Sequence, residues 1–236
     1  MTIVVADVKG LEVVAAAYLS QDEILCNEIR NKVDIHEKNR ERFNLPSRLI
    51  AKTYFFRLLY GGSANAYCYD PEFNWISKSQ DYWQEVIDTT YAKYEGLQMW
   101  HRSLMHEAQT TGRIECPTGR FFPFQPYLKR GEWQWPRTNI LNYPVQGLGA
   151  DLVALGRVEF ANKFREEKID GVLISSVHDS IVCDVPRHGE QRCSQLLSES
   201  VGEIPRLFRN TWGLEFDLPL FAEIKIGPNF KDLVEI

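Results

Sequence analysis

The sequence predicts a mixed α/β protein of the α+β type, with strands from both ends of the chain in one sheet and a long helical section between them. Three observations support this prediction. Of the 236 residues, 44% are hydrophobic and 25% are charged, which is typical of a folded globular protein. Short β-rich runs lie near both chain ends, whereas the middle repeats its apolar residues at helical spacing. No apolar run reaches the roughly 20 residues that cross a membrane.

The elements are expected in the following order. A strand at 4–8 precedes one or two helices over 11–30 and then a polar connection. The next helix is clearly bounded, because Ser47 is a suitable N-cap and Gly61-Gly62 a suitable stop. Helical spacing returns over 79–112, interrupted near Gly96. The remaining elements are a hairpin at 113–124, a helix at 146–167, strands at 171–177 and 181–185, a helix near 189–210 and a strand at 220–226.

Charge and cysteine content narrow the class of protein. The net charge of -5 excludes a protein that grips nucleic acid through overall basicity, so such binding must use local patches. The richest basic patch contains Arg40, Arg42, Arg48, Lys52 and Arg57. The five cysteines form no C-x-x-C pair, and the N-terminus lacks the features of a secretory signal. A reducing, cytoplasmic location is therefore expected.

The helix that follows Ser47 carries a stripe of four residues at intervals of four: Arg48, Lys52, Phe56 and Tyr60. Each step turns the stripe by about 40°, so the set winds slowly over about 18 Å of one helix face. The cations lie near the helix N-terminus, which already favours anions. A nucleotide would suit this order, with its triphosphate on the cations and its base on the aromatic rings. The alternative is a solvated basic face above packed aromatic residues.

Two carboxylates stand at the ends of apolar strands. Asp7 ends the first strand, and Asp179 lies between two apolar strands near the C-terminus. Two carboxylates that meet at strand ends would repel each other unless cations bridged them, as in a two-metal phosphoryl-transfer site. Magnesium is the natural ion, because no Cys/His set suited to zinc accompanies them. The alternative for each aspartate is turn formation. The doublet His178-Asp179 also occurs in metal-dependent phosphohydrolases, but there in an all-helical setting.

These residues fall into motifs that resemble the C-terminal polymerase region of family-A DNA polymerases, particularly phage enzymes. DVKGLE at 7–12 resembles motif A, Arg48-x3-Lys52-x3-Phe56-x3-Tyr60-Gly61 resembles the fingers-helix motif B, and VHD at 177–179 resembles motif C. DIH at 34–36 is similar to the phosphate-contacting segment of the family, TGR at 118–120 to its hairpin, and NYPVQG at 142–147 to its primer-template helix. The resemblance covers essentially the whole chain.

The resemblance implies an antiparallel palm sheet with a helical fingers subdomain. The palm would comprise 1–33 and 113–236, and the fingers with the following helices 34–112. It also implies template-directed addition of deoxynucleotides to a primer 3′-OH. The alternative is a non-catalytic DNA-binding or scaffolding subunit that keeps the fold.

The resemblance further implies roles for individual residues. Asp7, Asp179 and the Val8 carbonyl would hold two Mg²⁺ ions, for which Mn²⁺ can substitute. Lys52 would protonate the leaving pyrophosphate, and Glu12, packed beside Phe56 and Tyr60, would exclude a ribose 2′-OH. The other nucleotide-binding residues would be His36 and Arg48. Primer-template DNA would contact Tyr60, Gly61, Arg120, Asn142, Gln146 and His178.

The sequence departs from the family pattern at several positions. Ser180 replaces the usual Glu, Val14 and Thr138 replace common Arg residues, and the connection from His36 to Arg48 is short. Because motif A begins six residues after the first residue, we expect this chain to lack the thumb, the N-terminal palm strands and an exonuclease. We expect a second polypeptide, as in a split polymerase, to supply them, and a host cytoplasm as the location if the gene belongs to a phage.

Overall fold

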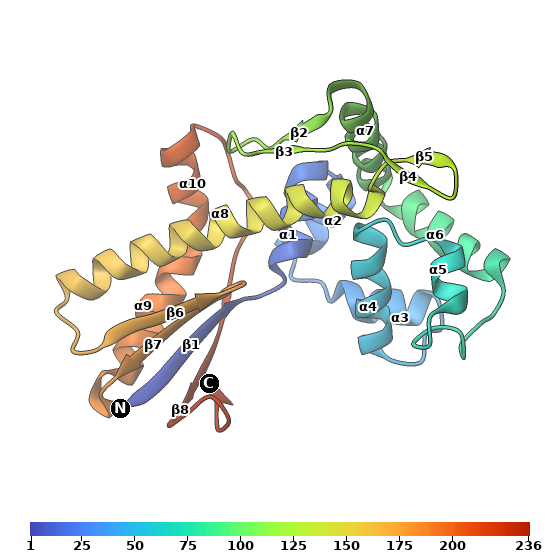
Figure 1. Cartoon of the computed structure of the whole chain (residues 1–236). Coiled ribbons are helices and arrows are strands. Elements are labelled where there is room, and N and C mark those ends of the chain that lie inside the picture. The colour runs from blue at the N-terminus through green and yellow to red at the C-terminus, as the bar shows by residue number, and fades with distance from the viewer. The chain divides into compact units, whose positions relative to one another are not determined.

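The computed structural model describes residues 1–236, which form two compact units. The sheet unit comprises Met1–Val14 with Gly147–Ile236, and the helical unit comprises Ala15–Gln146. Figure 1 colours both along the chain, from blue at the N-terminus to red at the C-terminus. These two units do not have the same boundaries as the palm (1–33 and 113–236) and fingers (34–112) expected from the sequence. The division of the chain into palm and fingers stays a prediction.

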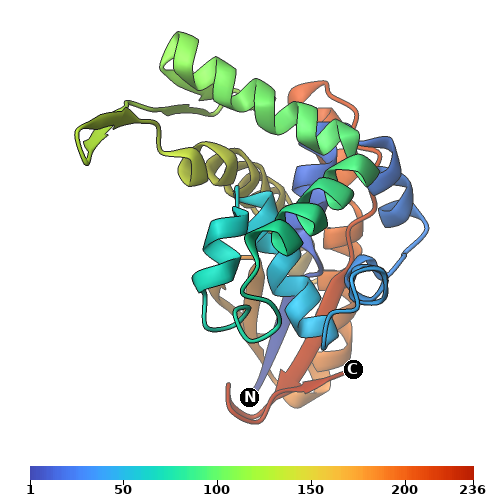
Figure 2. The same ribbon diagram turned by 90° about the vertical axis from the view of Figure 1, so that its right-hand side faces the viewer.

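The sheet unit contains five paired strands and the helices that accompany them. Its elements are β1 (Thr2–Val8), the start of α1 (Leu11–Ser20), most of α8 (Arg137–Glu166), β6 (Val172–Val177), β7 (Ser180–Val185), α9 (Glu190–Gly202), α10 (Ile204–Trp212), β8 (Ala222–Gly227) and β9 (Val234–Glu235). The strands form one antiparallel sheet in the order β6-β7-β1-β8-β9. The expectation that strands from both chain ends share a sheet is therefore confirmed. Both termini lie at the same end of this sheet (Figure 2).

The two faces of the sheet differ in chemistry because side chains alternate along each strand. On one face, Val4, Ala6 and Val8 of β1 are at most 1% exposed, and α9 packs against β1, β7 and β8. Cys183 of β7 contacts Cys193 of α9 on the same side. The opposite face therefore receives Asp7, and the apolar burial behind it fixes the register of the strand that carries this carboxylate.

The edge strand β6 is unusually apolar for an exposed edge. Val172, Leu173, Ile174 and Val177 are 40–53% exposed. Only one side of β6 is paired, with β7, so its other side presents unpaired backbone groups. An apolar edge of this kind is a surface that a binding partner can cover.

The helical unit is built from helices and two small hairpins. Its elements are the rest of α1, α2 (Glu23–Arg30), α3 (Ile35–Arg42), α4 (Arg48–Leu59), α5 (Ala64–Tyr69), α6 (Gln80–Lys93), α7 (Glu95–Thr111), β2 (Arg113–Glu115), β3 (Phe121–Pro123), β4 (Tyr127–Lys129), β5 (Glu132–Gln134) and the start of α8. Side chains cap the N-termini of α2 to α6. Ser47 caps α4 by accepting a hydrogen bond from the Ile50 amide, and Gly61 follows the helix at φ +84°, as the sequence predicts. The ribbon of β4 and β5 lies at the left of Figure 2.

Aromatic packing holds α4, α5 and α6 together. Trp83 is fully buried and stacks on Tyr67, with ring centroids 5.1 Å apart. The Tyr54 hydroxyl lies 2.8 Å from the Thr90 hydroxyl, so the buried polar atom of this ring is satisfied. This core fixes the helix that carries the predicted nucleotide-binding stripe.

Several elements differ from the sequence-based expectation, including α5 and β9, which were not expected. The polar connection contains α3, the helix expected at 146 begins nine residues earlier, and the helix expected near 189–210 is divided at Glu203. The hairpin β4–β5 was not expected. Pro205 in the first turn of α10 explains the division, because proline suits a new helix start. None of the helices combines the length and apolar character needed to cross a bilayer.

Candidate active site

The backbones that carry the two predicted carboxylates, Asp7 and Asp179, lie close together at one end of the sheet. His178 and Asp179 form the tight turn between β6 and β7, with His178 at φ +54°. The Val8 amide donates to the Asp179 carbonyl at 3.0 Å, and Asp7 is the register partner of Ser180. Strand pairing therefore brings residues 7 and 179 together although they are far apart in the sequence.

Asp7 lies in a row of three residues across neighbouring strands, since it is opposite Ser180 on β7 and Glu223 on β8. Lys225 also lies on β8, and its Nζ is 3.5 Å from Asp7 Oδ2 and 2.8 Å from Glu223 Oε1. The hydrogen bond to Glu223 raises the pKa of Lys225, and the charge of Asp7 adds to this effect. Lys225 is therefore a cation at the carboxylate end of the sheet.

The donor set suits a hard cation held jointly with a substrate. Asp7 and Asp179 supply carboxylate oxygens, and Val8 supplies a backbone carbonyl at the end of the strand. The chain contains no group of three or more His, Cys, Asp or Glu side chains that could hold a metal ion. Magnesium is commonly bound through one or two carboxylates, with waters and substrate phosphates completing its shell. The residues present fit such an ion.

Ser180 supports the turn that carries Asp179. Its hydroxyl donates to the Val177 carbonyl at 2.8 Å, and the Ser176 hydroxyl donates to the Ser180 carbonyl at 3.0 Å. Ser180 is 9% exposed. The serine that replaces a glutamate of the family pattern therefore has a structural partner of its own.

We expect Ser180→Ala to lower the free energy of unfolding by about 1 kcal/mol, because the hydrogen bond that closes the turn is lost. Urea denaturation measures this difference. Ser103→Ala is the control and should change stability less, since the hydrogen bond from the Ser103 hydroxyl to the Trp100 carbonyl is exposed to water. Equal stability of Ser180→Ala and the wild-type protein would contradict this role.

A second predicted group gathers on α3 and α4. Arg48 Nε donates to Asp34 Oδ2 at 2.7 Å, and Asp34 also caps α3 by accepting from the Glu37 amide at 3.0 Å. Although partial burial opposes it, the hydrogen bond from Arg48 lowers the pKa of Asp34. Lys52 is exposed, and its Nζ lies 5.7 Å from the centre of the Phe56 ring. Lys52 has no carboxylate partner, so it is the cation most available to a phosphate.

His36 packs against aromatic rings of α4 and is close enough to Arg48 and Lys52 to feel their charges. Its ring centre is 6.1 Å from that of Phe55 and 5.8 Å from that of Phe56, and its Nδ1 is buried without a hydrogen-bond partner. Burial lowers the pKa of His36 to about 4, and Arg48 and Lys52 add to the effect. His36 is therefore neutral at pH 7 and can donate a hydrogen bond to a phosphate oxygen.

His36 should make the free energy of unfolding depend on pH, with lower stability at lower pH. The ordinary pKa of His36 is 6.5, so the unfolded chain binds this proton before the folded chain, whose pKa is about 4. Stability should therefore fall as the pH decreases from 6.5 towards 4, by on the order of 3 kcal/mol from this group. His101, whose pKa burial lowers to about 3, contributes in the same direction.

We expect His36→Gln to lose less stability than the wild-type protein between pH 7 and pH 4.5. Urea unfolding at both pH values measures the difference. His106→Gln on the exposed side of α7 should keep the wild-type dependence. If the pH dependence of stability in His36→Gln equalled that of the wild-type protein, His36 would bind its proton as readily in the folded chain as in the unfolded chain, which would contradict the lowered pKa.

Tyr60, Gly61 and Gln146 also come together in the helical unit. Gln146 Nε2 donates to the Tyr60 hydroxyl at 3.1 Å. Gly61 has φ +84°, a backbone conformation that favours glycine, and a Cβ there would lie 3.0 Å from the Leu141 side chain on α8 and 3.2 Å from that of Arg137. Of the other residues with a predicted DNA contact, Arg120 and His178 are exposed and Asn142 is half-buried.

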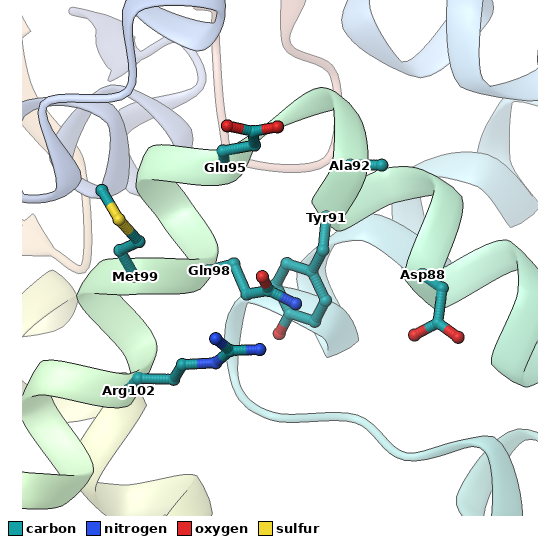
Figure 3. A pocket seen from close by; sticks show the side chains of 7 residues that line it. All are labelled: Asp88, Tyr91, Ala92, Glu95, Gln98, Met99 and Arg102. Carbon is teal, nitrogen blue, oxygen red and sulfur yellow. The ribbon is translucent and has the colours of Figure 1, made fainter.

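A separate hollow of about 450 Å³ lies between α6 and α7 (Figure 3). It is lined by Asp88, Tyr91, Ala92, Glu95, Gln98, Met99 and Arg102. Arg102 extends towards Tyr91 in this view. Burial raises the pKa of Tyr91, and the charge of Arg102 partly opposes this effect. None of the predicted site residues lines the hollow.

The partners that hold the predicted residues come mostly from other parts of the chain, so the sequence alone does not reveal them. The Asp34 cap was readable, because Glu37 follows it by three residues as in a capping box. The ion pair between Asp34 and Arg48 was not readable, since it joins two helices. Glu223 and Lys225 had no local signal, because their place beside Asp7 depends on the register of β1 and β8.

Comparison with known proteins gives a consistent result. Residues 1–232 match a family model described as DNA polymerase family A. The chain is 23% identical to a DNA polymerase I of Chloroflexus aurantiacus over 98% of its own length and 24% of that protein. It is 26% identical to a thermostable DNA polymerase I of Thermus filiformis, over 96% of its length and 26% of that protein. The chain thus spans about a quarter of these curated relatives.

A solved structure shares the fold. The POL domain of Pol1 from M. smegmatis, in complex with DNA primer-template and dNTP, superposes with a TM-score of 0.79 at 19% identity. The match covers 96% of this chain and 39% of that one. At this identity the likeness establishes the fold.

Proposed function

Because the chain belongs to DNA polymerase family A, we propose that it adds deoxynucleotides to a primer 3′-OH under the direction of a template, by two-metal-ion nucleotidyl transfer. The single observation that carries the proposal is the pairing of β1 with the β6–β7 turn, which joins Asp7 and Asp179 at one sheet end. Two carboxylates at such a position need a cation, and phosphoryl transfer uses one.

In this proposal, Asp7, Asp179 and the Val8 carbonyl hold two Mg²⁺ ions, for which Mn²⁺ can substitute. The ions, when bound, supply Lewis acidity to the primer hydroxyl and neutralise charge on the phosphates. Lys52 contacts the leaving pyrophosphate and can give it a proton. This role is supported by the absence of a carboxylate partner for Lys52.

The triphosphate is proposed to bind at the N-terminal end of α4. Neutral His36 donates a hydrogen bond there, and the Arg48 guanidinium offers a charged donor close by. Because Arg48 is bound to Asp34, a phosphate must share or replace that carboxylate. Phe56 and Tyr60 are proposed as the aromatic surface for the base and sugar.

Primer-template DNA is the proposed macromolecular ligand. Tyr60, Gly61 and Gln146 form one contact group, supported by their packing at the end of α4. The further proposed contacts are Arg120, Asn142 and His178. A polymerase domain of similar fold has been solved with DNA primer-template and dNTP, which supports these ligands.

Primer extension tests the function. A labelled primer annealed to a longer template should be extended by the purified chain with dNTPs and Mg²⁺, weakly by this chain alone and more strongly with the partner polypeptide, and EDTA should stop the reaction. The rival proposal, a non-catalytic DNA-binding subunit, expects primer-template binding without extension under any metal or partner condition. Ser180, in place of a family glutamate, is the observation that favours the rival.

Glu12 is proposed as the group that excludes ribonucleotides. It lies in the first turn of α1, five residues after Asp7, and is half-buried. Glu12→Ala should therefore raise the incorporation of ribonucleotides relative to deoxynucleotides by about tenfold, since one steric contact is worth about 1–3 kcal/mol in discrimination. Competition assays with matched nucleotide pairs measure the ratio. Glu12→Gln, which keeps the size of the side chain, is the control, and an unchanged ratio in Glu12→Ala would remove this assignment.

We also propose that a second polypeptide with thumb, N-terminal palm and exonuclease parts completes the polymerase. The apolar edge strand β6, with Val172, Leu173, Ile174 and Val177 exposed, is the observation that supports a partner. Five free, buried cysteines fit a reducing cytoplasm as the location. Adding the candidate partner should increase extension and make DNA binding more salt-dependent, because more phosphates are contacted. Full, processive extension by this chain alone, together with a stable monomer, would overturn the partner proposal.

A further inference from the structure

The carboxylate end of the sheet contains a lysine and an acid that the proposed mechanism does not use. Lys225 lies opposite Val5 in the register of β1 and β8, and Glu223 lies opposite Asp7. Directly paired residues of antiparallel strands point to the same face, and residues two apart on one strand do so too. Asp7, Glu223 and Lys225 therefore share one face of the sheet.

The distances place Lys225 unequally between its two acidic neighbours. Its Nζ is 2.8 Å from Glu223 Oε1, which is hydrogen-bonding distance, and 3.5 Å from Asp7 Oδ2, which is an ion pair at longer range. The side chains are 33% exposed for Lys225, 26% for Glu223 and 35% for Asp7. Water therefore reaches the group only in part, and the charges act on each other at short range.

A divalent ion on Asp7 would meet this ammonium group. An ion bound about 2.1 Å from Asp7 Oδ2 lies at most about 5.6 Å from an ammonium nitrogen that is 3.5 Å from the same oxygen. Lys225 repels an ion at that distance. Glu223 draws Lys225 away from Asp7 and so reduces this repulsion.

We propose that Lys225 is a positioning residue that neutralises Asp7 in the metal-free protein and competes with the divalent ion for it, and that Glu223 sets the strength of this competition by holding Lys225. The inference rests on the proposed function, because it needs Asp7 to bind metal. Glu223 acts here through Lys225, which agrees with the absence of a third acidic side chain gathered for a metal at this site.

The proposal gives opposite effects for the two residues. Lys225→Met should tighten the binding of Mn²⁺ about tenfold, because the competing charge is gone. Glu223→Gln should weaken it about tenfold, because Lys225 then turns to Asp7. Lys225→Arg keeps the charge and should stay within about twofold of the wild-type affinity. Lys231→Met, an equal charge change at an exposed lysine after β8, should leave the affinity unchanged.

The deciding experiment is a double-mutant cycle on Mn²⁺ affinity, measured by the electron paramagnetic resonance signal of free Mn²⁺ without DNA or dNTP. If Glu223 acts through Lys225, Glu223→Gln changes the affinity less than twofold in the Lys225→Met background. An equal loss in both backgrounds would make Glu223 a direct ligand or a plain charge and would overturn the proposal. A Lys225→Met variant with wild-type or weaker affinity would overturn it as well.

A reference variant separates this inference from the proposed function. Asp7→Asn should remove most of the Mn²⁺ binding. If it does not, the metal assignment of the proposed function fails. If Asp7→Asn removes binding while the Lys225 and Glu223 variants bind as the wild-type protein does, only the inference about these two residues fails. Circular dichroism of each variant checks that the sheet is retained.

Discussion

Asp7→Asn and Asp179→Asn are each expected to reduce primer extension by about 1,000-fold or more, while the proteins remain folded. Each change removes one of the two carboxylate charges that strand pairing brings to the same end of the sheet. Asparagine keeps the size of the side chain, and Asp7 is 35% exposed, so the packing behind β1 should be maintained. Single-turnover extension and thermal unfolding measure the two effects separately.

Asp184→Asn is the matched control for this pair of variants. Asp184 lies on β7 opposite Ile3, on the same face as Asp7 but towards the other end of the strand. It should keep wild-type extension. Turnover above one hundredth of the wild-type rate in Asp7→Asn, with unchanged melting, would contradict the assignment of the metal site.

Lys52→Met is expected to lower the rate of nucleotide addition about 100- to 1,000-fold, the usual cost of removing one charged group that stabilises a developing negative charge. The exposed position of Lys52 predicts little change in stability. Because the proposed role of Lys52 is to act on the leaving pyrophosphate, the loss should fall mainly on kcat, with a smaller rise in KM for the dNTP.

Lys38→Met is the control for this variant, since Lys38 is 56% exposed on the neighbouring helix α3 and the charge change is the same. Lys52→Arg should recover part of the rate, because it returns the charge without the compact ammonium group. A loss confined to KM would assign Lys52 to nucleotide binding and remove it from the chemical step.

The parts of the fold that the sequence predicts are those whose ends are set by residues close together in the chain. Ser47 and Gly61 mark the ends of α4 through hydrogen bonding and backbone conformation that involve only nearby residues. The polar helix α3 lacks an apolar face, so spacing could not reveal it, and its Asp34 cap was the only local sign. The early part of α8 was missed because Pro144 stands inside the helix, where proline is normally a stop.

The candidate site was predictable residue by residue, but its pairings were not. The order of the motifs located Asp7, Arg48, Lys52 and Asp179 on strand ends and on a helix face. Their neighbours were set by tertiary contacts, as when Asp34 binds Arg48. Lys225 shows the limit most clearly, since a shift of one residue in the register of β8 would place it on the other face of the sheet.

The border between the two units falls within helices at both crossings. The chain passes from Val14 to Ala15 inside α1 and from Gln146 to Gly147 inside α8. A protease therefore finds no extended linker there, and excising either unit would sever two helices. Each cut would leave about four amide and four carbonyl groups without their helical partners. Neither unit is therefore suited to exchange with the corresponding part of a related protein. Chimaeras with related chains should be joined in the loops outside α1 and α8.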